Sequence, residues 1–128
     1  MAKVLVVDDE AVVRDLLRCS LEAEGHAVIE GQDGADAVEK HQSERPDVVF
    51  MDIKMPRMDG IEALRKVRQS DPEAKVIMLT ALDDILMEQE ARKAGALDFL
   101  RKGIGFEAFM TVARRLLSRA EREAEGKT

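Results

Sequence analysis

The sequence predicts an α/β domain in which five short parallel strands alternate with five helices. Two observations lead to this fold class: branched apolar runs recur along the chain, and amphipathic helical patterns separate them. A third is size, because 128 residues with 45% hydrophobic content suit one domain with its own core. Strands that alternate with helices pair in parallel through right-handed crossovers, which leave helices on both faces of the sheet.

The expected strands are short and apolar on both faces, which is typical of strands that helices cover on each side. They are Lys3–Val7, Ala27–Glu30, Val48–Met51, Val76–Leu79 and Leu97–Leu100. Five such strands in one small domain favour the flavodoxin-like strand order 2-1-3-4-5. The predicted fold is therefore a flavodoxin-like (βα)5 domain with a doubly wound parallel sheet.

The first expected helix covers Ala11–Glu24, because apolar residues recur there every four positions. Gly25 follows it, at the position where a glycine ends many helices. Cys19 extends the side formed by Val12 and Leu16, so we expect it to be an inert thiol in the core.

The remaining helices differ in how clearly the sequence marks them. A weaker second helix is expected over about 33–42, and a fourth over Asp83–Ala94. The third begins at Asp59, because Asp59 and Glu62 have the spacing of a capping box. The fifth has the clearest apolar stripe, formed by Phe109, Val112, Ala113, Leu116, Leu117 and Ala120. We expect the domain to cover residues 1–120, and residues 121–128 to form a charged tail or the start of a linker.

The composition argues against several classes of function. A net charge of −6 disfavours nucleic-acid binding, a lone cysteine excludes an internal disulfide, and two histidines without ligand spacing disfavour a zinc site. No apolar run reaches the ~18 residues of a membrane helix, and the N-terminus lacks a signal-peptide pattern. We therefore expect a cytoplasmic chain without a membrane partner and without direct nucleic-acid contacts. Both His26 and His41 are expected on the solvent side.

Polar residues follow the apolar runs at the carboxyl ends of the expected strands, where open α/β sheets bind ligands. Asp8 and Asp9 follow the first strand, Asp52 the third and Thr80 the fourth, and Lys102 comes shortly after the fifth. A single acid at such a position could equally cap a helix. Three carboxylates at neighbouring strand ends repel one another, and Mg²⁺, which binds carboxylates, carbonyls and waters, relieves that repulsion. The sequence therefore predicts a magnesium site at this edge of the sheet.

The same residues indicate phosphoryl transfer to a carboxylate. Asp52 stands alone at the end of a central strand and is the expected nucleophile. Phosphoryl transfer depends mainly on positioning and on neutralising charge. Mg²⁺ held by Asp8 and Asp9 would supply positive charge, and Thr80 and Lys102 would contact the phosphoryl oxygens.

Motifs at these positions resemble the receiver domain of two-component response regulators, in the CheY-like superfamily. The resemblance covers essentially residues 2–120. The motifs are Val-Leu-Val-Val-Asp8-Asp9, Met51-Asp52-Ile-Lys-Met-Pro56-Arg-Met-Asp-Gly60, Leu79-Thr80-Ala81, Gly95-Ala-Leu-Asp-Phe99 and Lys102. Each motif alone is modest, whereas the ordered set is highly specific. The resemblance implies a phosphoacceptor switch in a two-component or phosphorelay pathway.

By that resemblance, Asp52 accepts a phosphoryl group from a histidine kinase or a phosphotransfer protein. Asp9, Asp52 and the backbone carbonyl of Lys54 would bind Mg²⁺ directly, and Asp8 would act through water. The phosphorylated chain would then affect a downstream protein, or an effector domain that is missing from this chain.

The resemblance also implies a switch and an output surface. Thr80 would turn toward the phosphoryl group and Phe99 would turn inward behind it. This would change a face formed by the fourth helix, the fifth strand and the fifth helix, which could also form a homodimer. Lys54 and Leu82 occupy positions that influence the lifetime of the phosphoryl group in the family. Since neither offers a carboxylate or amide to orient water, we expect slow self-dephosphorylation.

Gly103 stands where the family usually has a proline after the lysine. A cis bond before a residue other than proline costs about 2.5–4 kcal/mol, so we expect a trans peptide here. Gly103 and Gly105 also loosen the loop, so the sequence leaves open where Lys102 is placed. The alternative interpretation is a pseudo-receiver, a protein-binding module that works without phosphorylation.

Two other classes fit less well. A Mg²⁺ phosphohydrolase would need a second acid two residues after its nucleophile, where Lys54 stands. A flavin carrier would need a phosphate-binding loop after the first strand, but the acidic Asp8, Asp9 and Glu10 would repel a phosphate there. We expect no enzyme activity on an external substrate, since the chain would catalyse only its own phosphorylation and dephosphorylation.

Overall fold

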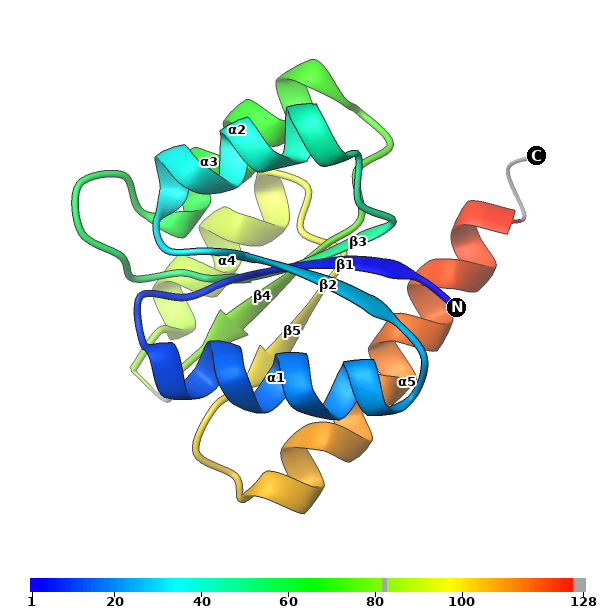
Figure 1. Ribbon diagram of the computed structural model, residues 1–128. Coiled ribbons are helices and arrows are strands. Elements are labelled where there is room, and N and C mark those ends of the chain that lie inside the picture. Colours follow the sequence, from blue (N-terminus) through cyan, green and yellow to red (C-terminus); the bar gives the residue numbers. More distant parts are fainter. Residues whose placement is uncertain (82, 126–128) are drawn as a thin grey trace.

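The five strands pair in parallel in the order β2-β1-β3-β4-β5 in the computed structural model, which describes residues 1–81 and 83–125 (Figure 1). The strands are β1 (Lys3–Val7), β2 (Ala27–Gly31), β3 (Val48–Asp52), β4 (Val76–Thr80) and β5 (Asp98–Arg101). The helices are α1 (Ala11–Ala23), α2 (Gly34–Glu44), α3 (Gly60–Ser70), α4 (Ile85–Lys93) and α5 (Phe106–Glu125). The predicted fold class and strand order are confirmed.

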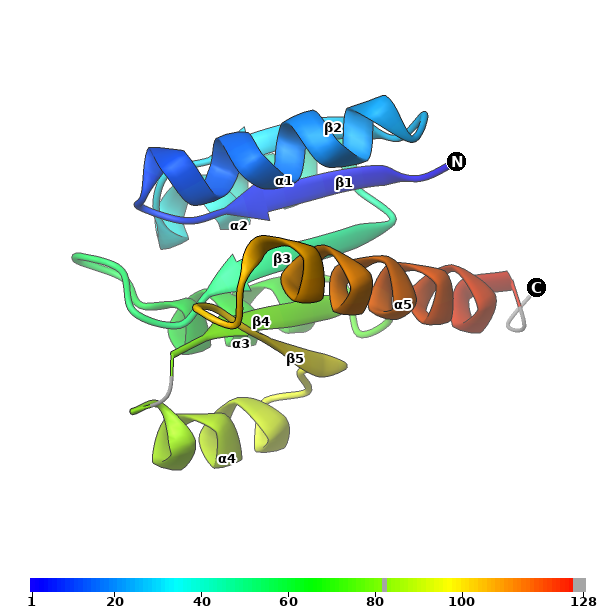
Figure 2. The ribbon, with the colours of Figure 1, turned by 90° about the horizontal axis from the view of Figure 1, so that it is seen from below.

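Helices cover both faces of the sheet, as Figures 1 and 2 show. Helices α1 and α5 lie on one face, over a core that includes Leu17, Phe50 and Met110. Helices α2, α3 and α4 lie on the other face, over a core that includes Leu64 and Met78. Side chains alternate between the faces along a strand, so each central strand contributes to both cores. This explains why the strands are apolar at successive positions.

The register of the sheet places the carboxyl ends of the strands next to one another. Asp52 pairs with Leu79, and Thr80 pairs with Arg101. Strands β3 and β4 therefore include Asp52 and Thr80 as their last residues, one residue beyond the apolar runs. The backbone N–H of Lys102 donates to the carbonyl of Thr80 at 2.8 Å and so continues the ladder. The loops that follow β1 and β3 lie at the left of Figure 1.

The ends of the helices follow local signals in the sequence. The carboxylate of Asp59 accepts the N–H of Glu62 at 2.9 Å, which confirms the predicted cap of α3. Gly25 follows α1 with a φ of +93°, in the left-handed region expected at that position. Helix α4 begins at Ile85, later than predicted, and the N–H of Asp84 just before it donates to the carbonyl of Ala81 at 3.2 Å.

One side of α1 is exposed, and the prediction for Cys19 is therefore wrong. Cys19 is exposed, as are Val12 and Leu16 on the same side of the helix, at 70% and 43%. Helix α1 packs on the sheet through a narrow side that contains the fully buried Leu17 and Leu21. Side chains on the neighbouring side of the helix consequently remain in solvent.

The prediction that His41 lies on the solvent side is also wrong, because only 2% of this residue is exposed. Helix α2 packs against α3 as well as against the sheet, so two of its sides are covered. The Nε2 atom of His41 lies 3.7 Å from the carboxylate of Asp71, and burial lowers the pKa of His41. His26 is half-buried, and its Nδ1 accepts the N–H of Ala2 at 2.9 Å.

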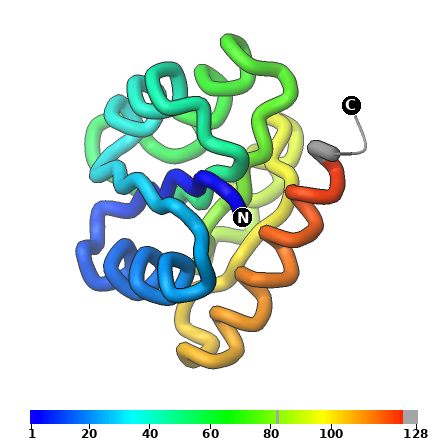
Figure 3. Tube along the Cα trace, turned by 45° about the vertical axis from the view of Figure 1, so that its right-hand side comes forward, coloured from blue at the N-terminus to red at the C-terminus, as the bar shows by residue number. Residues whose placement is uncertain are grey.

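Helix α5 continues beyond the predicted domain boundary at residue 120 and ends at Glu125. The amine of Met1 lies 3.8 Å from the carboxylate of Glu121, and Figure 3 shows the N-terminus near this helix. Residues 126–128 of the predicted tail lie outside the described residues, and a linker role for 121–128 stays a prediction. No helix in the described part of the chain is long and apolar enough to cross a membrane.

Candidate functional site

Lys102 is central to the site because its ammonium contacts three carboxylates. Its Nζ lies 2.7 Å from Asp8, 3.2 Å from Asp52 and 3.3 Å from Glu10. Asp8 follows β1, Asp52 ends β3 and Lys102 follows β5, so the sheet brings these predicted residues together. The peptide between Lys102 and Gly103 is trans, as predicted, and Lys102 nevertheless reaches Asp52.

The acidic run after β1 gathers three carboxylates in a small space. One oxygen from each of Asp8, Asp9 and Glu10 lies within 4.8 Å of the other two. Asp8 is fully buried, and its Oδ1 accepts the N–H of Glu10 at 2.8 Å. The guanidinium of Arg14 donates to the carbonyl of Asp8 at 2.5 Å and fixes the turn. Sequence reasoning missed Glu10, although it belongs to the same acidic run.

Burial and repulsion change the acidity of the site. Burial, followed by repulsion from Asp8, raises the pKa of Asp52 to about 7. Burial also raises the pKa of Asp8, although a hydrogen bond from Lys102 opposes that change. Burial alone would lower the pKa of Lys102. Hydrogen bonds with Asp8 and Asp52 and the attraction of their charges have a larger combined effect, so the pKa of Lys102 is raised. The charged forms of Asp8 and Asp52 therefore remain disfavoured, although Lys102 lies between them.

Thr80 presents a buried hydroxyl at the end of β4, beside Asp52 on β3. The side chain is fully buried, and its Oγ1 makes no hydrogen bond within the described part of the chain. Buried hydroxyls in folded proteins nearly always have a partner. An acceptor oxygen held at the end of β3 could supply that partner.

Gly60 brings the start of α3 against the end of β3. Its N–H donates to the carbonyl of Ile53 at 2.7 Å. A Cβ at position 60 would overlap the carbonyl oxygen of Asp52, so only glycine allows this approach. Gly60 thereby determines where the backbone of Asp52 lies relative to α3.

Lys54 connects the loop after β3 with the loop after β4. Its Nζ lies 3.0 Å from Asp83 and 3.1 Å from Asp84. The hydrogen bond from Lys54 lowers the pKa of Asp83, and hydrogen bonds to Asp83 and then Asp84 raise the pKa of Lys54. Neither acid was predicted as part of the site, because a contact between two loops leaves no spacing signal in the sequence.

Phe99 connects β5 with α4. The ring is partly buried against the core beneath α2, α3 and α4. The guanidinium of Arg92, on α4, lies 4.7 Å from the centre of that ring. The switch roles of Thr80 and Phe99 stay predictions. Leu82, predicted to influence the lifetime of the phosphoryl group, lies outside the described residues.

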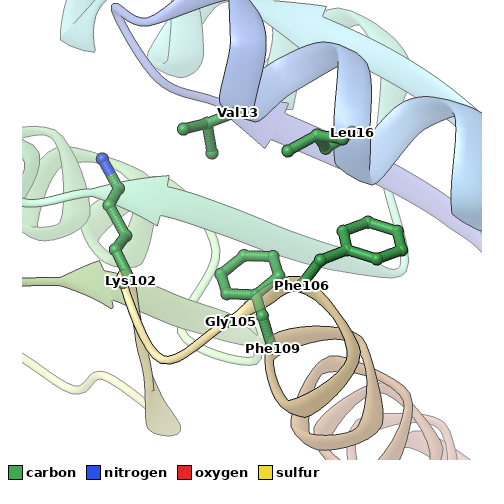
Figure 4. Close-up of a pocket in the computed structure, with 7 residues that line it drawn as sticks. Val13, Leu16, Lys102, Gly105, Phe106 and Phe109 are labelled. Atoms are coloured by element: carbon green, nitrogen blue, oxygen red, sulfur yellow. The ribbon is translucent and has the colours of Figure 1, made fainter.

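An apolar groove lies beside Lys102, between α1 and the turn that leads into α5. The groove has a volume of about 230 Å³ and is lined by Val13, Leu16, Lys102, Gly103, Gly105, Phe106 and Phe109. In Figure 4, Val13 and Leu16 point from α1 toward the rings of Phe106 and Phe109. Phe106 is 50% exposed and the adjacent Ile104 is 43% exposed, so apolar side chains at the groove remain accessible to solvent.

The fold and the site together define a class of protein. A parallel sheet in the order 2-1-3-4-5 carries an acidic run, a buried aspartate, a threonine and a lysine at its carboxyl edge. This combination is that of a receiver domain. The family model described as the response regulator receiver domain matches residues 4–114, and the chain belongs to this family of two-component signalling proteins.

Curated relatives carry the same family name. The chain is 39% identical over 117 residues to the response regulator MprA of Mycolicibacterium vanbaalenii, an alignment that covers 91% of this chain and 51% of the relative. It is 36% identical over 126 residues to the response regulator MprA of Mycobacterium avium, covering 98% of this chain and 55% of the relative. The chain thus spans about half the length of the curated relatives it matches.

Solved receiver structures share the fold. The chemotaxis protein CheY4 of Vibrio cholerae matches with a TM-score of 0.82 and 33% identity, covering 91% of this chain and 98% of that chain. The response regulator domain of Thermotoga maritima CheB matches with a TM-score of 0.80 and 37% identity, covering 94% and 93%. NtrX of Brucella abortus matches with a TM-score of 0.87 and 32% identity, covering 98% of this chain and 29% of that chain.

Proposed function

We propose that the chain is a phosphoacceptor switch of a two-component or phosphorelay pathway, in which Asp52 accepts a phosphoryl group from a histidine kinase or a phosphotransfer protein. The observation that carries this proposal is the contact of one ammonium with two buried carboxylates. Lys102 Nζ lies 2.7 Å from Asp8 and 3.2 Å from Asp52. A lysine at that distance can also contact an oxygen of a phosphoryl group on Asp52. Membership of the receiver family supports the same role.

The reaction moves a phosphoryl group from nitrogen to oxygen. A carboxylate oxygen of Asp52 forms the new bond to phosphorus while the P–N bond of a phosphohistidine breaks. The electron pair of that bond leaves with the imidazole, which takes up a proton. Phosphoryl transfer depends on positioning and on stabilising charge. Lys102 would stabilise charge on the phosphoryl oxygens, and Thr80 would donate its buried hydroxyl to one of them.

A divalent cation fits the acidic run next to Asp52. Mg²⁺ would be held by Asp9, Asp52 and the backbone carbonyl of Lys54, with Asp8 acting through water. The clustering of one oxygen each from Asp8, Asp9 and Glu10 within 4.8 Å supports this fit. Burial, which disfavours the charged forms and raises the pKa values of Asp8 and Asp52, is consistent with a site completed by a cation. When bound, the ion would supply positive charge that keeps Asp52 ionised and offsets charge on the transferred group.

The apolar groove beside Lys102 suits the docking of the phosphodonor protein. A donor must bring its phosphohistidine within bonding distance of Asp52, so it has to contact the surface around the site. Leu16 and Phe106 offer exposed apolar area at that surface, on α1 and at the start of α5. A mixed apolar and charged surface of this kind is typical of transient protein contacts.

The output would pass through the face formed by α4, β5 and α5. Thr80 and Phe99 would be its switch residues, and Arg92 already joins Phe99 to α4. A change at Thr80 would reach this face because β4 pairs directly with β5. The recipient would be a downstream protein, an effector domain or a second copy of the chain.

Intact mass spectrometry tests the proposal. The wild type, Asp52→Ala and Asp15→Ala would be incubated with Mg²⁺ and acetyl phosphate, a small phosphodonor. Asp15 is a matched control, because its side chain is 59% exposed on α1. The wild type and the control should gain the mass of one phosphoryl group, and Asp52→Ala should not. Removal of Mg²⁺ with a chelator should abolish the gain.

The opposite result would identify the other candidate function. If the wild type binds Mg²⁺ but gains no phosphoryl mass, the chain is not a phosphoacceptor. It would then act as a phosphorylation-independent binding module, the pseudo-receiver considered above. The contact between Lys102 and Asp52 favours the phosphoacceptor over this alternative.

A further inference from the structure

Asp84 is a buried acid outside the residues assigned so far to phosphoryl transfer. It is 1% exposed and directly precedes α4. Its Oδ2 accepts the N–H of Ala81 at 2.7 Å, and its Oδ1 lies 3.1 Å from the Nζ of Lys54. A buried carboxylate is costly unless it is paired and hydrogen-bonded. Asp84 therefore relies on Lys54 for its counter-charge.

The two partners of Asp84 come from the two strand ends that would hold one phosphoryl group. Lys54 is two residues after Asp52, in the loop that follows β3, and Ala81 directly follows Thr80 at the end of β4. Asp84 thus ties the segment after Thr80 to the segment after Asp52.

The neighbouring Asp83 makes a weaker contribution to this connection. Its carboxylate lies 3.0 Å from Lys54, but its side chain is 73% exposed. Ion pairs exposed to that extent contribute little to stability. The buried Asp84, with its second bond to Ala81, is therefore the acid that fixes the segment.

Ala81 and Asp84 are also connected to α4 and β5. The guanidinium of Arg101, on β5, donates to the carbonyl of Ala81 at 3.4 Å and to the carboxylate of Glu88 at 3.1 Å. The N–H of Glu88 donates to the carbonyl of Asp84 at 2.9 Å. A movement of Asp84 would consequently reach the first turn of α4 and the end of β5.

We propose that Lys54 and Asp84 form an electrostatic latch, which holds Ala81 and Asp84 in place until a phosphoryl group on Asp52 draws Lys54 away. The opening step rests on the proposed phosphorylation of Asp52. A phosphorylated side chain carries about two negative charges at neutral pH, which is more than the carboxylate of Asp52 carries, so it competes for the ammonium of Lys54. A buried carboxylate that loses its counter-charge is strongly destabilised. Asp84 then leaves its buried position and releases the N–H of Ala81.

Asp84 is, in this proposal, a positioning residue that acts through the segment after Thr80. Among the described residues, the side chain of Asp84 interacts with Ala81 and Lys54 and not with Asp52 or Lys102.

Amide hydrogen exchange measured by NMR tests the closed latch without any phosphorylation. The N–H of Ala81 is the reporter, because Asp84 accepts its hydrogen bond. In Lys54→Met this amide should exchange about three- to tenfold faster than in the wild type. Lys54→Arg keeps a cation at the position and should restore slow exchange. Asp84→Ala removes the acceptor of this hydrogen bond and should exchange fast, whereas Asp83→Ala should resemble the wild type.

A matched control and reference amides separate the latch from general destabilisation. Lys3→Met removes another exposed ion pair, between Lys3 and Glu44 at the opposite end of β1, and should leave the Ala81 amide unchanged. The exchange rates of the amides of Val6 and Ala113, in the core beneath α1 and α5, should be the same in Lys54→Met as in the wild type. Unchanged exchange at Ala81 in Lys54→Met, or an equal rise at all amides, would overturn the proposal.

A second measurement tests the opening of the latch. The same exchange is recorded after treatment with Mg²⁺ and acetyl phosphate, and intact mass counts the phosphoryl groups in the same samples. Exchange at Ala81 should rise in the phosphorylated wild type and should not rise further in phosphorylated Lys54→Met. A phosphorylated wild type with unchanged exchange would overturn the opening step. A wild type that gains no phosphoryl mass would refute the proposed function instead, while the first measurement still decides whether the latch exists.

Discussion

Replacing Asp52 by asparagine should stabilise the protein in the absence of Mg²⁺, by an amount that grows between about pH 4 and pH 7 and stays constant above pH 7. The reason is the electrostatic penalty on the buried carboxylate. Burial and repulsion from Asp8 raise the pKa of Asp52 from 3.8 to about 7. A rise of that size corresponds to about 4 kcal/mol against the ionised form, and solvent screening and the interaction shared with Asp8 reduce it to about 2 kcal/mol.

The sign of the pH dependence follows from proton binding. Because the pKa of Asp52 is higher in the folded protein, the folded state binds more protons than the unfolded state between about pH 4 and pH 7. Stability from this group is therefore greatest below the unfolded pKa and is lost as the pH rises through that window. Asparagine has no such charge to bury. The variant should be equal to the wild type near pH 4 and about 2 kcal/mol more stable near pH 8.

Urea unfolding followed by far-UV circular dichroism measures this difference, since the chain has no Trp or Tyr for a fluorescence signal. Asp15→Asn makes the same chemical change at an exposed acid and should show no such pH dependence. Added Mg²⁺ should stabilise the wild type more than Asp52→Asn, because it binds the folded state of the wild type. A difference between variant and wild type that is the same at low and high pH would refute the burial argument.

Three further substitutions test other parts of the site. Gly60→Ala places a methyl group against the carbonyl oxygen of Asp52 and should cost about 1–3 kcal/mol in urea unfolding, with slower phosphorylation by acetyl phosphate. Thr80→Val removes a buried hydroxyl that lacks a partner among the described residues; stability should stay equal or rise by up to about 1 kcal/mol, while phosphorylation slows. Phe106→Ala removes a half-exposed ring from the groove, so transfer from autophosphorylated histidine kinases should slow about tenfold at an unchanged rate with acetyl phosphate. A loss of stability in Thr80→Val, or equal slowing with both donors in Phe106→Ala, would contradict these assignments.

The fold was predictable because each element carries its own local signal. Apolar runs such as Lys3–Val7 indicate strands buried on both faces, and Asp59 and Gly25 indicate helix ends by chemistry confined to a few residues. The residues at the strand ends were predictable for the same reason, since the carboxyl ends of parallel strands meet at one edge. Asp52 and Thr80 required only the positions at which the apolar runs stop.

Contacts between distant segments were not predictable in this way. The pairing of Lys54 with Asp84 depends on the paths of two loops, and neither path leaves a periodic pattern in the sequence. Cys19 was placed in the core from helix periodicity, but the width of the covered side of a helix depends on its neighbours. His41 shows the opposite error, because α3 covers a second side of α2.

The sequence left the placement of Lys102 open because of Gly103, and in the structure the lysine reaches Asp52 because its backbone extends the ladder between β4 and β5 by one bond. Its N–H donates to the carbonyl of Thr80 at 2.8 Å, so the ladder between β4 and β5 positions the lysine at the start of the turn. The turn itself uses Gly103 with a φ of +81°.

The usual proline of the family should consequently harm this chain rather than improve it. Proline has a φ near −65°, which is incompatible with the value at position 103, so Gly103→Pro should cost more than about 1 kcal/mol in urea unfolding. Gly103→Ala is the matched control: its Cβ would meet no atom within 4 Å, so it should lose only the roughly 1 kcal/mol of the left-handed backbone. If Gly103→Pro is as stable as the wild type and is phosphorylated faster, the turn can adopt another path. The ladder would then not suffice to place Lys102.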